Sequence, residues 1–173
     1  MARGDQAERL PARVSVDAQA EIRVATGLPI LDHLLELLAT LGGFGLWLEV
    51  GAGDGEEEVA AAGRSLGEAL AERLGSGAAR GHGSAVVPAD EALAHVTIEA
   101  SGRPLVVSNV DLSGEHVGGL GTDLVASFLR ELAGGAGLTL HVRLIEGRDT
   151  QHVLETIFKG LGVALAQACR PRR

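Results

Sequence analysis

Three side chains near the end of the sequence, His152, Glu155 and Lys159, have a spacing that could support metal or acid–base chemistry. On a helix, His152 and Glu155 are three residues apart and share a face, which Lys159 continues four residues later. An imidazole and a carboxylate at this spacing can point at one divalent ion, and His141 on a preceding strand could approach the same place. Nitrogen and oxygen ligands without a thiolate favour manganese, zinc, iron or nickel. The alternative is that these side chains form an ordinary solvated helix face.

A further histidine, His33, follows Asp32 in a leucine-rich segment that is typical of a helix. It is either a partly buried structural residue or a ligand that the neighbouring carboxylate orients. We interpret the three histidines in a glycine-rich turn, an alternating strand and a polar loop as structural or surface residues: His82, His95 and His116.

Three arginines with small or turn-forming neighbours, Arg80, Arg103 and Arg148, could form forked hydrogen bonds to a phosphate or a carboxylate. The alternative is that they are exposed loop residues. Lys159 is the only lysine among 15 basic residues. Arginine bias usually reflects coding preference, but a single retained lysine is also consistent with a required ammonium group, since arginine replaces such a point charge poorly.

The composition excludes several classes of protein. The 173 residues are 46% hydrophobic and 22% charged, which is typical of one globular domain, and no apolar run approaches the roughly 20 residues of a membrane helix. The first residues lack an apolar signal region, so we expect a cytoplasmic protein. A net charge of −8 and 2% aromatic residues argue against nucleic-acid binding. A single cysteine, Cys169, permits no internal disulfide.

Hydrophobic periodicity predicts the elements that must position these residues. Helices are expected over residues 28–41, 57–74, 122–133 and 151–169. Strands are expected over residues 45–50, 91–100, 104–110 and 137–145, with a possible start at 84–87. Residues 12–24 alternate and are expected to form a hairpin, and the last four residues are expected to be frayed.

An internal repeat is more informative than any single element. Residues 38–50 (LATLGGFGLWLEV) align with residues 130–142 (RELAGGAGLTLHV), and LGEAL at 66–70 aligns with LGVAL at 161–165. Two matches in the same order favour duplication over chance similarity of Gly-, Leu- and Ala-rich sequence. We therefore expect an α+β domain of two repeats, about 12–80 and 85–169, in which two helix layers pack together between two sheets.

Three runs of the sequence together resemble imidazoleglycerol-phosphate dehydratase, the lyase of histidine biosynthesis. They are TGLPILDHLLELLATLGGFGL (26–46), VPADEALAHVTIEASGRPLVV (87–107) and AGLTLHVRLIEGRDTQHVLETIFKGLGVALAQA (136–168). The resemblance implies an internally duplicated fold of two four-stranded sheets with two helices each. It also implies a homo-oligomer, a trimer or a larger shell of trimers, that binds manganese between subunits and acts on a small phosphorylated substrate.

The resemblance implies metal ligands at His33, at His141 and at a His-His-x-x-Glu motif in each repeat. In the second repeat this motif falls on Gln151, His152 and Glu155, so an amide, which is a poor metal ligand, replaces one imidazole. The ligands that match are therefore His33, His141, His152 and Glu155.

In the first repeat the same motif falls on Glu56, Glu57 and Ala60, where neither histidine and no matching glutamate is present. Carboxylates at Glu56 and Glu57 would tolerate manganese or magnesium but are weaker than imidazole for zinc. Losing even a residue that orients a ligand costs roughly 10- to 100-fold in affinity or activity. We therefore expect one remodelled metal site or none.

The resemblance assigns substrate-phosphate binding to Arg80, Arg103 and Lys159, although the family's C-terminal Ser-Thr-Lys loop has no counterpart here. It implies removal of water from a phosphorylated imidazole-glycerol substrate, with metal ions as Lewis acids, Glu155 as base and His33 as an acid–base group or ligand. Two hypotheses follow: a dehydratase whose site is intact or impaired, and a catalytically inactive paralogue that keeps the oligomeric scaffold and a phosphate-ligand site.

Overall fold

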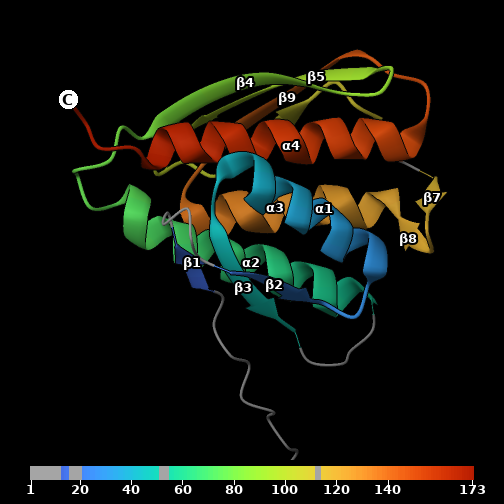
Figure 1. Cartoon of the computed structure of the whole chain (residues 1–173), viewed down its shortest axis with the longest axis horizontal. Helices are drawn as coiled ribbons and strands as arrows, with labels where there is room; N and C mark the ends of the chain where they lie inside the picture. The colour runs from blue at the N-terminus through green and yellow to red at the C-terminus, as the bar shows by residue number, and fades with distance from the viewer. Residues whose placement is uncertain (1–12, 16–20, 51–54, 112–113) are drawn as a thin grey trace, which may run out of the picture.

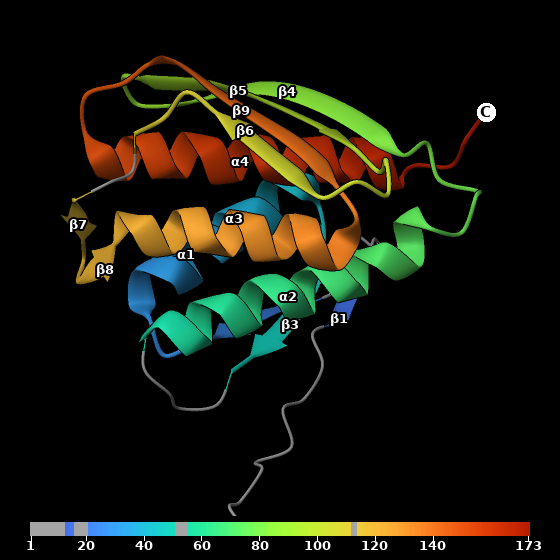
Figure 2. The ribbon, with the colours of Figure 1, turned by 180° about the vertical axis from the view of Figure 1, so that it is seen from behind.

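Two β-sheets enclose two layers of helices in the computed structural model, which describes residues 13–15, 21–50, 55–111 and 114–173 (Figures 1 and 2). Helices α1 (Pro29–Gly42) and α2 (Gly55–Leu74) pack on the first sheet, and α3 (Thr122–Ala136) and α4 (Thr150–Cys169) pack on the second. In the middle, α2 contacts α3 and α1 contacts α4. The expected α+β architecture, with helices packed between two sheets, is confirmed.

The first sheet has three strands among the described residues, in the order β1-β3-β2. These are β1 (Arg13–Ser15), β2 (Ile22–Ala25) and β3 (Gly45–Glu49). β3 pairs antiparallel with β1 and parallel with β2. The hairpin expected over residues 12–24 is therefore wrong, because β3 lies between its two strands. Alternating residues indicate a strand but do not indicate which strand it pairs with.

The second sheet contains β4 (His82–Ala89), β5 (Ala92–Glu99), β6 (Leu105–Ser108) and β9 (Thr139–Glu146), in the order β4-β5-β9-β6. β9 pairs antiparallel with β5 and parallel with β6, which is the pairing that β3 makes with β1 and β2. A short hairpin of β7 (His116–Val117) and β8 (Leu120–Gly121), which the periodicity did not predict, leads into α3.

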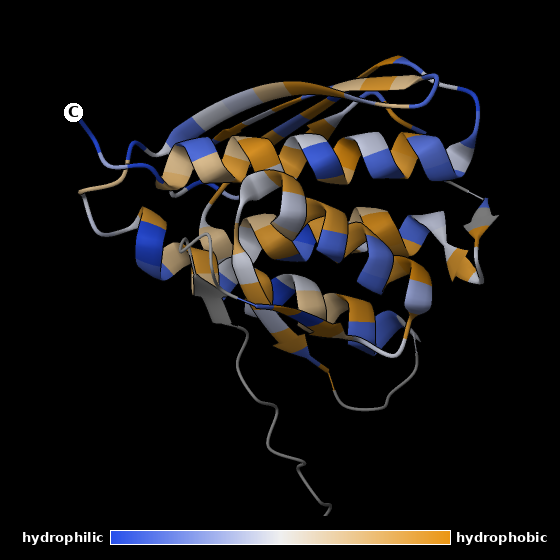
Figure 3. Ribbon diagram, viewed as in Figure 1, coloured by the Kyte–Doolittle hydropathy of each residue, from blue (hydrophilic) through white to orange (hydrophobic). Residues whose placement is uncertain are grey.

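Apolar residues of the helices fill the space between the sheets (Figure 3). Alternate residues of β5, among them Val96 and Ile98, are buried against the helices, while their neighbours face the opposite side of the sheet. The rings of Phe128 on α3 and Phe158 on α4 are fully buried with centroids 5.6 Å apart. No helix in the described part of the chain has the length and apolarity that crossing a membrane requires.

Glycines allow the helices of the two layers to approach closely. A Cβ atom at Gly67 of α2 would lie only 2.6 Å from the carbonyl oxygen of Leu132 on α3. In the same way, a Cβ atom at Gly162 of α4 would collide with the carbonyl group of Leu38 on α1. Gly67 and Gly162 occupy the same position in the repeated LGEAL and LGVAL segments, so the repeat marks the two crossings between helix layers.

The end of the chain is held against the loop that follows α2. Pro171 forms an isolated β-bridge with Ala79, the Arg80 N–H donates to the Arg170 carbonyl at 2.7 Å, and the Arg172 N–H donates to the Ala78 carbonyl at 2.6 Å. The expectation of a frayed end over residues 170–173 is therefore wrong. Backbone pairing, to which side-chain pattern gives no clue, holds this segment.

Candidate active site

His33 and Glu155, two of the residues singled out in the sequence, meet where α1 packs on α4. The His33 Nε2 atom lies 3.1 Å from Glu155 Oε1. With a proton on Nε2, the imidazole donates to the Glu155 carboxylate, because an ionised carboxylate only accepts hydrogen bonds. The Glu155 side chain is 15% exposed and the His33 side chain 44% exposed. The pair therefore joins a shielded carboxylate to an imidazole that solvent can reach.

Gln151 adds a second hydrogen-bond donor to the same carboxylate. Its Nε2 amide group donates to Glu155 Oε1 at 3.1 Å, from one turn earlier on α4. Glu155 Oε1 thus receives one N–H from an amide and one from an imidazole. The side chain of α4 that contacts Glu155 is therefore Gln151, four residues earlier, and not His152, three residues earlier, as the spacing was expected to give.

Asp32 does not orient His33, although it is its neighbour in the sequence. Asp32 Oδ1 accepts hydrogen bonds from the Thr26 backbone N–H at 2.9 Å and the Thr26 hydroxyl at 2.5 Å. These contacts fix the turn between β2 and α1, where Pro29 occupies the first turn of the helix. The carboxylate beside His33 therefore comes from Glu155, 122 residues further along the chain.

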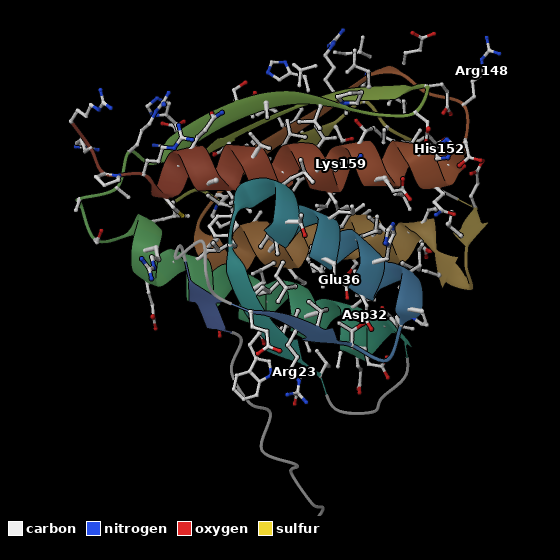
Figure 4. The ribbon with its side chains drawn as sticks, viewed as in Figure 1. Arg23, Asp32, Glu36, Arg148, His152 and Lys159 are labelled. Atoms are coloured by element: carbon white, nitrogen blue, oxygen red, sulfur yellow. The ribbon has the colours of Figure 1, made fainter. Side chains whose placement is uncertain are left out.

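His152 lies near the start of α4 (Figure 4), and its side chain contacts carboxylates of the turn between β4 and β5 and that of Asp149. Its Nδ1 atom is 2.7 Å from Glu91 Oε2, and its Nε2 atom is 3.4 Å from Asp90 Oδ2. The hydrogen bond to Glu91 raises the pKa of His152, and Asp149 and Asp90 add to the effect. This cluster favours a protonated imidazole, whereas a metal ligand must be neutral.

Glu91 holds together the loop that begins α4. Its Oε1 atom accepts the backbone N–H groups of Arg148 at 3.2 Å and Asp149 at 2.8 Å. The Asp149 hydrogen bond and then that of His152 lower the pKa of Glu91 to about 2. The sequence interpretation gave Glu91 no role. The signal available in the sequence was the Asp90-Glu91 pair between two alternating segments, which is typical of a tight turn. In the structure, Asp90 adopts a positive φ of 52° in this turn.

His141 lies on the outer face of the second sheet, opposite the helices. It pairs with Thr97 of β5 and Val107 of β6, and it lines an open groove of about 500 Å³ together with His95, Asn109 and Arg143. Next to this groove, His95 Nε2 is 2.6 Å from the Ser84 hydroxyl. Within one chain, His141 is therefore separated from the His33–Glu155 pair by the sheet itself.

The expected phosphate-binding residues lie at two different ends of β4. Arg80 and Arg103 flank the end where Gly81 pairs with Ala100, and Arg80 Nε donates to His82 Nε2 at 3.0 Å. Lys159, in the middle of α4, donates to the Pro88 carbonyl at 3.4 Å, at the other end of the strand (Figure 4). At about 3.3 Å per residue, roughly 20 Å of strand separates the two ends. Within one chain, Arg80 and Arg103 therefore do not converge with Lys159 on one phosphate.

Glu56 and Glu57 are exposed in the first turn of α2, and Ala60 follows one turn later. In the described part of the chain, no group of three or more His, Cys, Asp or Glu side chains is arranged to hold a metal ion. His33 with Glu155, His152 with its acidic neighbours, and His141 form three separate places. The residues of one chain that the structure describes therefore do not fit a complete divalent-metal site.

Comparison with known proteins agrees with the resemblance in the sequence. A family model described as imidazoleglycerol-phosphate dehydratase matches residues 26–165. Relatives of that name from Desulforudis audaxviator and Syntrophobacter fumaroxidans are 42% and 41% identical, over 91% and 94% of this chain and 83% and 84% of theirs. The crystal structure of imidazoleglycerol-phosphate dehydratase from Staphylococcus aureus superposes with a TM-score of 0.87 at 34% identity, over 96% of each chain.

Proposed function

The chain belongs to the imidazoleglycerol-phosphate dehydratase family of hydro-lyases, and we propose that the His33–Glu155 pair carries its reaction. The substrate class is a small phosphorylated imidazole-glycerol compound, and the pathway is histidine biosynthesis, which we expect in the cytoplasm. The observation that supports this proposal most is the 3.1 Å contact between a shielded carboxylate and a reachable imidazole. A dehydration uses a base that takes a proton from carbon and an acid that protonates the leaving hydroxyl group, and a carboxylate and an imidazole are side chains of these two types.

The pair can account for every proton in the loss of water. Glu155 takes the proton from the carbon whose C–H bond breaks, while protonated His33 gives a proton to the hydroxyl group that leaves as water. In this scheme the proton that His33 gives is the one on Nε2, so the 3.1 Å contact then lets Glu155 return its proton to that nitrogen, which restores the starting state. Gln151 holds the Glu155 carboxylate in place through the hydrogen bond to its Oε1 atom.

We propose that the enzyme works as a homo-oligomer, with a trimer as the expected unit. The outer face of the second sheet exposes Val86, Leu105, Val107 and Ile145 around His141, and none of the helices that the structure describes covers it. Apolar side chains on an open sheet face favour burial against another protein surface. In such an assembly, His141 of one copy and Arg80 and Arg103 could complete a site that begins with His33, Glu155 and Lys159 of another. Light scattering that shows only monomers would contradict this proposal.

Membership of this family implies a divalent metal ion, which when bound supplies a Lewis acid. Manganese and the number of ions are parts of the proposal. The expected ligands are His33, His141, His152 and Glu155, of which only His33 and Glu155 are in contact within the chain. We therefore derive the proton transfers above from the side chains alone.

The proposed function is tested by a dehydratase assay on the purified full-length protein with imidazoleglycerol phosphate. We expect turnover that falls about 100-fold or more in Glu155→Gln, because a general base contributes at least that much. Glu99→Gln is the matched control, since Glu99 is an exposed carboxylate at the far end of β5. Unchanged turnover in Glu155→Gln would show that the pair is not the site.

The same assay decides the alternative of an inactive paralogue. That alternative is favoured by Gln151 in the second repeat and by Glu56, Glu57 and Ala60 in the first, where the family motif has histidines and a glutamate. It predicts no turnover at any manganese concentration, together with binding of a phosphorylated ligand that is lost in Arg103→Ala.

A further inference from the structure

We infer that Gln151 is a positioning residue that holds the Glu155 carboxylate by a hydrogen bond in a place where a third metal ligand would otherwise stand. The Gln151 amide nitrogen and the His33 Nε2 atom both lie 3.1 Å from Glu155 Oε1. Two N–H groups from two helices therefore converge on one oxygen of a carboxylate that is largely shielded from solvent. This inference rests on the same His33–Glu155 pair as the proposed function. Its readout is the amount of bound metal, which does not depend on turnover.

The chemistry of this trio disfavours a cation. An amide nitrogen has no free lone pair, and Gln151 Nε2 donates a proton to the carboxylate oxygen that a metal ion would need. If the amide turned to present its oxygen, it would lose its hydrogen bond to Glu155 and face a like partial charge. The three side chains thus form a hydrogen-bonded cluster. Only two of them, His33 and Glu155, are of a type that commonly binds metal ions.

A histidine at position 151 would change this balance. Residues 151 and 155 are one turn apart on α4, and the existing contact shows that a side chain at 151 reaches Glu155 Oε1. An imidazole there would bring a second nitrogen lone pair to the pair formed by His33 and Glu155. Two imidazoles and one carboxylate are a ligand set that manganese and zinc accept.

The test compares manganese binding to the full-length protein with binding to its Gln151→His variant. Each protein is stripped with a chelator, dialysed against graded manganese chloride and analysed for bound metal. We expect Gln151→His to bind manganese at least about 10-fold more tightly than the wild type, the scale on which even ligand-orienting residues act. Gln167→His is the matched control, since Gln167 is the other glutamine of α4 and its Oε1 atom accepts the Ser84 backbone N–H.

The inference is overturned if Gln151→His binds manganese no more tightly than the wild type, or if Gln167→His gains as much. If Gln151→His does not fold, Gln151→Glu provides the same test, because glutamate matches glutamine in size and adds an oxygen ligand. Its affinity for manganese is then expected to exceed that of the wild type by a similar factor. Failure of the dehydratase assay with a gain in metal affinity would reject the proposed function and keep this inference.

Discussion

His33 Nε2 lies 3.1 Å from Glu155 Oε1 across the contact between α1 and α4. The internal repeat relates these two positions to Val125 on α3 and Ala60 on α2, at the contact between the other two helices. Neither Val125 nor Ala60 can transfer a proton or bind a cation. Of the two pairs of positions that the sequence repeat relates, only His33 and Glu155 therefore carry acid–base side chains.

Replacement of His33 by asparagine is expected to lower kcat about 100-fold or more, because the variant loses the group that protonates the leaving hydroxyl. His33 is partly exposed, so the variant should unfold at nearly the same temperature as the wild type. Steady-state kinetics and thermal unfolding measure the two effects. Glu68→Gln, at an exposed position of α2, is the control and should keep its kcat. A loss smaller than about threefold in His33→Asn would remove His33 from the reaction.

The contact between His152 and Glu91 predicts a pH dependence of stability. The pKa of His152 is raised above 6.5, so its contribution is complete below that value and is lost as the pH rises through the raised pKa. The pKa of Glu91 is lowered from 4.5 to about 2, so its contribution is complete above 4.5 and is lost as the pH falls toward 2. The two contributions overlap between 4.5 and 6.5, where His152→Gln should lower the melting temperature most.

A double-mutant cycle isolates this contact from the other hydrogen bonds of Glu91, which also holds the backbone of Arg148 and Asp149. The coupling between Glu91→Gln and His152→Gln is expected to stabilise the fold at about pH 5.5 and to fade by about pH 9. A coupling that grows from pH 5.5 to pH 9 would contradict the assignment.

The sequence predicted the helices to within a few residues but not which strands pair or which side chains meet. Leucine periodicity placed α1 and α4 correctly because burial of an apolar helix face leaves a strong local pattern. No such local pattern indicates that β1 pairs with β3 and not with β2, since the packing of the whole sheet sets which strands pair.

For the site, spacing on α4 pointed to His152 and Glu155, and the structure joins Glu155 to His33 but His152 to Glu91. Helix spacing gives only the face on which a side chain lies. The partners of that side chain come from elements that lie far away in the sequence, here α1 and the turn between β4 and β5. The placement of His141 on the far side of the sheet could be derived from strand alternation only after β9 had been paired.

The glycines at the helix crossings give a prediction about stability. Gly67→Ala is expected to destabilise the protein by about 1–3 kcal/mol, because the new Cβ atom would lie 2.6 Å from the Leu132 carbonyl oxygen and force the helices apart. Gly134→Ala on α3 is the matched control, since nothing lies within 4 Å of its Cβ position. That variant should gain up to about 1 kcal/mol from helix propensity. Chemical denaturation of both variants measures the difference, and equal stabilities would reject the close-approach argument.

Thr156 fastens α4 to the second sheet beside Glu155, and its hydroxyl group is the subject of the last prediction. The side chain is fully buried; its Oγ1 atom donates to the Val87 carbonyl and accepts the Ala94 N–H at 3.2 Å, where the β5–β9 register shifts. Thr156→Val keeps the shape but leaves both backbone groups without this partner, so we expect a loss of about 1–3 kcal/mol in unfolding free energy. Thr156→Ser keeps the hydroxyl and should lose only about the 0.8 kcal/mol of one buried methyl group. If the valine variant is as stable as the serine variant, the hydroxyl does not hold the helix on the sheet.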